Sequence, residues 1–320
     1  MKRALLLLAL LALPASSHAA PQGGSPVALV TAETQNKLIA VALPSGHVIR
    51  WFRMPADPQN VETNGNYAVV VSPRAGAVTL VGVRRLRILK VLRGFGSPHI
   101  VLIVPGRNLA YVTDDTRGQL DVIDLGRHRV VGRVFVGFGA HHLAISPDRS
   151  RVWVALGERA QSITVLNTTR LKAPRVIGHV DPAGAAHDLA FSPQGGRVWV
   201  TYDDRSEIGI FDAHTWRRLR VRPAGSPPQH IAFDESSAAR HAYLTSGNDG
   251  TLSILSIRTE RTLRTVRTAP GSFNVWTGGS LVLTSSLTTG MLTELDWNGR
   301  VLLRKHVAPA ARDVALAVLP

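Results

Sequence analysis

The sequence of 320 residues predicts an all-β fold, a seven-bladed β-propeller whose blades are four-stranded antiparallel sheets. The main observation is a repeat of 39 to 46 residues that runs along the chain. Each copy contains four short runs of β-branched and apolar residues, separated by turns such as Ser-Pro-Asp and Asn-Asp-Gly. Four strands in such a period are typical of a propeller blade, because each twisted sheet buries its faces only against its neighbours.

The two ends of the chain predict how the ring closes. A seventh copy begins with "RDVALAV" near the C-terminus and contains only a first strand, whereas residues 27–55 supply three strands that lack a first one. Joined, the two ends make one complete blade, with the C-terminal strand innermost. We therefore expect seven blades and a closed ring, which leaves no unpaired strand edge at either terminus.

The first 20 residues predict a signal peptide. Lys2 and Arg3 precede an apolar run from Ala4 to Leu13, and small residues follow up to Ala20. This order is typical of a secretory signal, and the run is too short for a stable transmembrane anchor. We expect an exported protein, periplasmic or extracellular, with a single propeller domain over residues 21–320 and no transmembrane segment.

Composition limits the chemistry available to the chain. It contains no cysteine, which excludes disulfides, thioether-linked haem, thiolate zinc sites and cysteine catalysis. A metal would have to be held by carboxylates and by some of the 12 histidines. The formal net charge of +15 favours acidic partners without naming one.

Three stretches of the repeat resemble a known family. They are "YVTDDTRGQLDVIDL", "SPDRSRVWVALGERAQSITVLN" and "SPQGGRVWVTYDDRSEIGIFD". They are similar to the YVTN-type β-propeller repeats and to the propeller domains of cd-type nitrite reductases. The resemblance implies an exported seven-bladed propeller. It implies no single activity, because the family includes binding proteins, haem carriers, lyases and lactonases.

Polar residues recur where the first strand of each copy begins. Aligning the copies places seven of them in register, namely Asn60, His99, His142, Asp188, His230, Asn274 and Asp313. The preceding position adds His141 and His187. The first strand of every blade lines the central channel, so these residues should form a ring around one mouth of it. Pleat alternation predicts that His142 faces the axis with His99 and His230, while His141 lies in the loop layer beside His187.

This ring has two interpretations. As a ligand site, neutral imidazoles together with Asp188 and Asp313 could hold zinc, copper or a haem iron, or bind an anion when protonated. The candidate metal ligands are His99, His142, His187 and His230. As a structural feature, polar residues at strand starts bond the loop backbone and line a water-filled channel.

Two functional hypotheses follow. The preferred one is a non-catalytic exported propeller that binds a small molecule or a protein at the histidine-rich mouth. The alternative is a metal- or haem-dependent enzyme or cofactor carrier, namely a lyase, a lactonase or a haem-handling protein, that uses the same histidines. The sequence names neither a cofactor nor a catalytic residue.

Basic residues are also in register, on the fourth strand of several copies. They occur in residues 84–93, 217–222, 258–267 and 300–305. Charge on an edge strand prevents pairing between sheets, which is the simpler interpretation. The alternative is a basic rim that binds a polyanionic surface such as lipopolysaccharide or glycan. Nucleic acid is not expected, because no aromatic residues are interleaved for base stacking. Trp153 and Trp199 should pack between blades.

Overall fold

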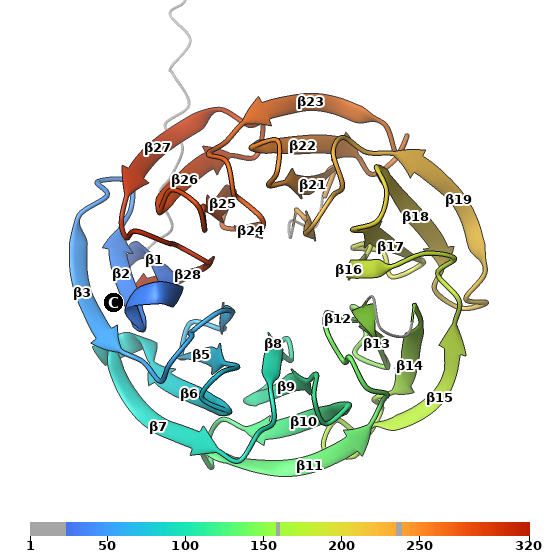
Figure 1. Cartoon of the computed structure of the whole chain (residues 1–320), viewed down its shortest axis with the longest axis horizontal. Helices are drawn as coiled ribbons and strands as arrows, with labels where there is room; N and C mark the ends of the chain where they lie inside the picture. Colours follow the sequence, from blue (N-terminus) through green and yellow to red (C-terminus); the bar gives the residue numbers. More distant parts are fainter. Residues whose placement is uncertain (1–23, 158–160, 235–238) are drawn as a thin grey trace, which may run out of the picture.

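The computed structural model describes residues 24–157, 161–234 and 239–320, and these form a ring of seven four-stranded antiparallel sheets (Figure 1). The predicted signal peptide lies outside the described residues. Two 3-10 turns, η1 (Glu33–Gln35) and η2 (Val83–Arg85), accompany the strands. Within the described ranges, no helix has the length and apolar character needed to cross a membrane.

Six blades are each built from four consecutive strands, with the first strand at the channel and the fourth at the outside. In chain order, these blades comprise β4 (Val61–Thr63), β5 (Tyr67–Ser72), β6 (Ala77–Gly82) and β7 (Arg87–Arg93); β8 (Pro98–Ile103), β9 (Leu109–Asp114), β10 (Gln119–Asp124) and β11 (Arg129–Phe135); β12 (Leu143–Ile145), β13 (Arg151–Ala155), β14 (Ile163–Asn167) and β15 (Arg175–Val180); β16 (Ala186–Phe191), β17 (Arg197–Tyr202), β18 (Glu207–Asp212) and β19 (Arg218–Pro223); β20 (Ile231–Phe233), β21 (His241–Ser246), β22 (Thr251–Ser256) and β23 (Thr262–Arg267); and β24 (Trp276–Gly278), β25 (Leu281–Ser285), β26 (Met291–Asp296) and β27 (Val301–His306).

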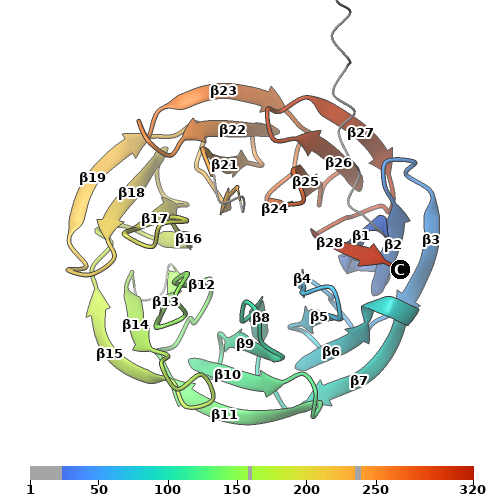
Figure 2. The ribbon, with the colours of Figure 1, turned by 180° about the vertical axis from the view of Figure 1, so that it is seen from behind.

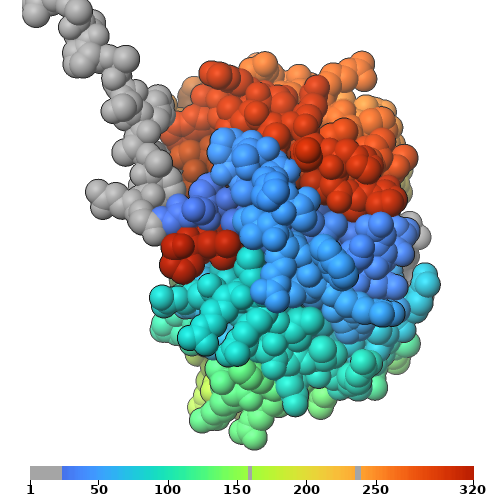
Figure 3. All heavy atoms as spheres, turned by 90° about the vertical axis from the view of Figure 1, so that its left-hand side faces the viewer, coloured from blue at the N-terminus to red at the C-terminus, as the bar shows by residue number. Residues whose placement is uncertain are grey.

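The seventh blade joins the two ends of the chain and confirms the predicted closure. It has the order β28 (Asp313–Leu319), β1 (Ser25–Ala32), β2 (Lys37–Ala42) and β3 (Val48–Arg53). β28 runs antiparallel to β1 over its whole length, from Asp313 opposite Thr31 to Leu319 opposite Ser25. Figure 2 shows β28 on the channel side of β1, and Figure 3 shows the strands β1–β3 of this blade in blue between the red and teal neighbouring blades.

The hydrophobic core lies between adjacent blades. Trp153 and Trp199 are fully buried in two such interfaces, as predicted. Tyr111 and Tyr243 occupy the same position in their own blades. Each of the four aromatic residues is the third residue of the second strand of its blade. Each of these rings fills the space that a twisted sheet leaves against its neighbour.

Buried threonines on the second strands hold the residues that line the mouth. The hydroxyl of Thr113 donates to the carbonyl oxygen of His141 at 2.6 Å, and that of Thr201 donates to the carbonyl of Gln229 at 2.7 Å. Thr31 makes the same bond to Gln59 at 2.7 Å. Each bond crosses from one blade to the chain segment that leads into the next inner strand. These bonds fix the backbone just before the inner strands β12, β20 and β4, where the predicted site lies.

Candidate functional site

The structure gathers the predicted site residues at one mouth of the channel. Eight of the nine line a cavity of about 320 Å³, namely Asn60, His99, His141, His142, His187, His230, Asn274 and Asp313. The ninth, Asp188, lines the adjoining space below, together with His142 and His230. Residues that are up to 253 positions apart in the chain therefore meet in one place, as Asn60 and Asp313 do.

Five imidazole rings form a continuous cluster, which we call the histidine cluster: His99, His141, His142, His187 and His230. His99 stacks on His141, with 3.7 Å between ring centroids. His142 lies at the centre, with its centroid 4.5 Å from that of His141 and 4.6 Å from those of His187 and His230. The side chain of His142 is almost fully buried, while the other four are partly exposed.

The predicted separation of these rings into two layers is wrong. It assumed regular pleating, which would send His141 and His142 to opposite sides. However, β12 begins only at Leu143, so both residues precede the strand. His99 lies within an irregularity of the β8–β9 pairing, and His187 lies within one of the β16–β17 pairing. Without regular pleats, the five rings converge.

In His142, His187 and His230, the Nδ1 atom of the ring lies beside a polar partner. His142 Nδ1 lies 2.7 Å from His141 Nδ1, so one of the two must donate a proton to the other. His187 Nδ1 lies 3.6 Å from a carboxylate oxygen of Asp203, and His230 Nδ1 lies 3.6 Å from one of Asp188. An imidazole that holds its proton on Nδ1 keeps a lone pair on Nε2.

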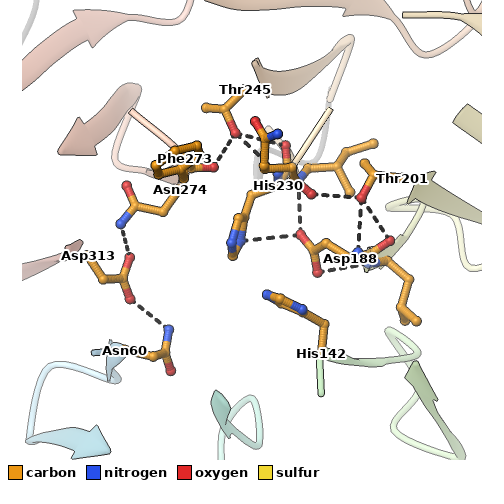
Figure 4. A network of polar contacts seen from close by, with 12 residues as sticks. Asn60, His142, Asp188, Thr201, His230, Thr245, Phe273, Asn274 and Asp313 are labelled. Atoms are coloured by element: carbon orange, nitrogen blue, oxygen red, sulfur yellow. Dashed lines mark hydrogen bonds and ion pairs between the residues drawn. The ribbon is translucent and has the colours of Figure 1, made fainter. Parts of the chain in front are cut away.

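The Nε2 atom of His142 is buried and has no hydrogen-bond partner among the described residues. His142 and His230 line the same cavity, and Figure 4 shows their rings close together with the Asp188 carboxylate beside them. A buried nitrogen without a partner is costly in an apolar setting, so this atom requires an explanation.

Two overlapping sets of three histidines are close enough to hold a metal ion. They are His99, His141 and His142, and His142, His187 and His230. In each set, one ring nitrogen from every residue lies within 4.8 Å of the other two. His142 belongs to both sets.

Burial keeps four rings of the cluster neutral, those of His99, His141, His142 and His230. Burial lowers the pKa of His99 to about 3 and that of His141 to about 2, with further lowering from neighbouring positive charge. Burial also holds the pKa of His142 and of His230 well below the ordinary value of 6.5. At neutral pH these four side chains therefore carry ring lone pairs and no charge.

The carboxylates and amides of the ring serve mainly to connect blades. Asp188 accepts the backbone N–H groups of Leu189 at 2.8 Å and of Ile231, in the next blade, at 3.0 Å. Asp313 in the same way accepts the N–H of Val61, in the next blade, at 2.9 Å. Burial raises the pKa of both carboxyls to about 6.

The two amides of the ring continue this pattern. Asn60 accepts the N–H of Val101 at 2.9 Å and donates to Asp313 at 2.7 Å. Asn274 donates to the carbonyl of Arg312 at 2.6 Å. The structural interpretation of the polar column thus holds for these residues, whereas the histidines have no comparable bonds to the next blade among the contacts described.

Two charged residues at the mouth, Asp203 and Arg312, were not among the predicted site residues. Asp203 contacts His187 from the turn that follows β17. Arg312 lines the cavity and its charge lowers the pKa of His99, while its guanidinium lies 3.7 Å from the Glu33 carboxylate. The alignment of the copies places Arg312 directly before the last inner strand, so its position at the mouth could be predicted from the sequence. Nothing in the repeat predicts that Asp203 reaches the mouth.

Comparisons with known proteins identify the fold only. No protein-family model and no curated protein matches the sequence, so the YVTN-type resemblance stays a resemblance. Similar solved structures include a functionally unknown protein from Desulfotomaculum acetoxidans, with 12% identity and a TM-score of 0.80, covering 92% of this chain and 99% of that one. Apo AztD from Citrobacter koseri has 11% identity and a TM-score of 0.74, covering 93% and 99%. Kuenenia stuttgartiensis hydrazine synthase has 16% identity and a TM-score of 0.68, covering 82% and 90%.

Proposed function

We propose that this chain is an exported, non-catalytic propeller that binds a divalent transition-metal ion of the zinc or copper class in the histidine cluster. The observation that carries the proposal is the set His142, His187 and His230, whose ring nitrogens lie within 4.8 Å of one another. Tetrahedral zinc with bonds of about 2.0–2.1 Å needs nitrogens about 3.4 Å apart. Small ring rotations would close that difference.

The contacts on the far side of each ring support this set over the other. Metal-bound histidines usually donate their second ring N–H to a carboxylate or another acceptor, which fixes the ring and its tautomer. Asp203 and Asp188 stand in that position for His187 and His230, and His141 does so for His142. In this arrangement all three Nε2 lone pairs are free for the metal.

The ion would also satisfy the buried Nε2 of His142, which otherwise has no partner among the described residues. Neutral rings with a lowered pKa need not lose a proton before they bind a cation. Imidazole ligands suit zinc, copper, nickel and iron, and the absence of cysteine removes competing thiolates. The contacts between the rings leave no flat slot between them, which disfavours a haem at this set.

A metal-dependent enzyme, such as a lyase or lactonase, is the second candidate. Three histidine ligands leave one position of a tetrahedral ion open, as in catalytic zinc sites, and Arg312 lines the same cavity. An open position would let a water or a substrate oxygen reach the metal. Hydrolysis of ester and lactone probes by the metal-loaded protein, lost in His187→Ala, would favour this candidate over simple binding.

Export belongs to the same proposal and rests on the first 20 residues alone. Expression of the full chain followed by N-terminal sequencing of the product tests it. Cleavage after Ala19 or Ala20, with the product outside the cytoplasm, is the expected result. An uncleaved cytoplasmic product would contradict it.

Calorimetric titration of the metal-free protein tests the binding proposal. Zn²⁺ and Cu²⁺ should bind saturably at one equivalent, and His142→Ala should abolish binding. His306→Ala is a matched control, because His306 is an exposed histidine on β27, away from the cluster. Absence of saturable binding, or an equal loss in the control, would overturn the proposal.

A further inference from the structure

A second cavity lies outside the histidine cluster. It is a cleft of about 790 Å³ between the β16–β19 blade and the β20–β23 blade. Residues that follow the channel strand β16 line it, so it opens toward the face opposite the histidine-rich mouth. Its volume lies within the range of small-molecule sites.

Positive charge distinguishes this cleft from two comparable ones. Arg197, Arg240 and Arg258 line it, and the described residues at its wall include no carboxylate. The cleft between the β12–β15 and β16–β19 blades is about 380 Å³ and contains Asp148. The cleft between the β20–β23 and β24–β27 blades is about 300 Å³ and contains Asp234.

The carboxylate of Glu260, which contacts Arg197 at the cleft, does not neutralise the other two arginines. Glu260 is buried and contacts the guanidinium groups of Arg197, Arg220 and Arg222. One carboxylate therefore meets three cations and also fixes the orientation of Arg197. Arg240 and Arg258 have no ion pair among the described residues, so positive charge remains at the wall.

A buried donor in the same cleft provides an independent indication. The side chain of Trp199 is fully buried and lines the cleft, and its Nε1 has no hydrogen-bond partner among the described residues. At the same position in other blades, the Tyr111 hydroxyl donates to the carbonyl of Leu171 at 2.8 Å, and that of Tyr243 donates to the carbonyl of Trp297 at 2.7 Å.

In both of those cases the acceptor belongs to the turn between the third and fourth strands of the next blade. The corresponding turn beside Trp199 contains Ile257 and Arg258, and there the cleft occupies the space. Trp153 also has an unpartnered Nε1, but it does not line the smaller cleft beside its blade. A cleft, a buried indole N–H without a partner, and two arginines without an ion pair among the described residues thus occur together at Trp199.

The geometry points to a binding site for a small organic oxyanion, a phosphate or sulfate ester. The polar side chains that distinguish the cleft are donors, so its ligand must be rich in acceptors. Guanidinium groups bind tetrahedral oxyanions through paired hydrogen bonds. Ile257, Leu263 and the Trp199 ring line the same cleft and suit the carbon skeleton of the ester. This site is separate from the proposed metal site.

Calorimetric titration at constant physiological ionic strength tests the inference, because salt screens unspecific attraction to the surface. The probes are a hexose phosphate, a sulphated heparin disaccharide, inorganic phosphate and inorganic sulfate. One of the esters should bind saturably at one equivalent, and the preferred ester identifies the ligand class. Binding of the inorganic ions alone would overturn the assignment to an ester.

Two variants and a control locate the site. Arg240→Gln with Arg258→Gln should weaken binding about 100-fold, or about tenfold for each charged hydrogen-bond donor lost. Arg84→Gln with Arg85→Gln removes the same charge from the equivalent turn of another blade and should change affinity less than about twofold. Trp199→Phe should weaken binding, because it removes the indole N–H while keeping an aromatic side chain at this position.

Equal losses in the two double variants, or no saturable binding of any probe, would overturn the inference. Thermal unfolding of each variant identifies any that fail to fold, and Arg240 and Arg258 are exposed enough to be replaced safely. Metal titration should be unchanged in all of them. Failure of the metal proposal and failure of this one are therefore distinguishable.

Discussion

The Nδ1 atoms of His141 and His142 lie 2.7 Å apart, although neighbouring side chains on a regular strand point in opposite directions. Both residues precede β12, and Thr113 of the previous blade holds the carbonyl of His141 at 2.6 Å. The bond between the rings joins His141 to the centre of the histidine cluster. When His142 donates, its Nε2 is left as a free ligand nitrogen.

Replacing His142 should abolish metal binding while leaving the fold intact. His142→Ala removes the ring shared by both sets of three histidines. In the metal-free protein, the free energy of unfolding should change by less than about 2 kcal/mol, because the lost ring carries a buried nitrogen without a partner. Urea denaturation and metal titration measure the two effects. A loss of several kcal/mol without metal would assign the histidine a structural role instead.

Removing the carboxylate behind His187 should weaken the metal site without destroying it. Asp203→Asn keeps the shape of the side chain but loses the charge that stabilises the metal-bound imidazole. We expect metal affinity to fall about 10- to 100-fold, the usual cost of losing an outer partner. Asp204→Asn is the matched control, since Asp204 pairs with Arg205. Equal affinity in the two variants would contradict the role of Asp203.

The repeat predicted the blades and their closure because four strands per copy and a lone seventh first strand allow one ring. It also predicted the column of polar residues, since register along the inner strands follows from the repeat. It did not predict that Asp188 and Asp313 connect blades while the histidines cluster, because that depends on which backbone N–H each side chain reaches. The layering of His141 and His142 failed because strand starts are set by tertiary pairing.

The stability of the metal-free protein should fall as the pH falls from 7 toward 5. The pKa values of His99, His141, His142 and His230 are lowered in the folded state, so the unfolded chain, with values near 6.5, binds more protons in this range. The raised pKa values of Asp121, Asp188 and Asp313, each about 6, oppose this trend between about pH 6 and 4, because there the folded state binds more protons. Four histidines outweigh these three carboxyls.

Urea midpoints at pH 7.5, 6 and 5 measure this dependence. The double variant His142→Ala with His230→Ala should show a shallower decline, since two of the four groups are gone. An identical decline in the double variant would mean that the histidine cluster does not control the acid sensitivity.

Closure of the ring should depend on the side of β28 that is buried against the neighbouring blade. Ala317 is buried in the core cluster of the closing blade, whereas its neighbour Val318 is 42% exposed. Ala317→Asp should lower the free energy of unfolding by about 3 kcal/mol or more, because it places an unpaired carboxylate in the core. Val318→Asp should change it by less than about 0.5 kcal/mol. Thermal and urea denaturation provide the comparison.

Truncation tests the same closure more severely. Removing residues 313–320 deletes β28 and exposes the edge of β1, a loss comparable with the whole stability of a domain. The truncated chain should be insoluble. A cooperative, folded monomer without β28 would contradict the role of this strand.

The basic outer strands should bind polyanions only weakly. Part of their charge is already neutralised, since Arg220 and Arg222 contact Glu260. In the variant Arg240→Gln with Arg258→Gln, which removes the arginines of the proposed oxyanion cleft, retention on heparin should therefore vanish by about 0.15 M salt, where exposed charges are screened beyond about 8 Å. Replacing Arg220 or Arg222 is a poor test, because it removes partners of a buried carboxylate. Arg87→Gln, Lys90→Gln and Arg93→Gln on β7 test the rim without that effect. Retention well above physiological salt that is lost in this triple variant would show a specific polyanion site, because unspecific attraction depends on total charge rather than on one strand.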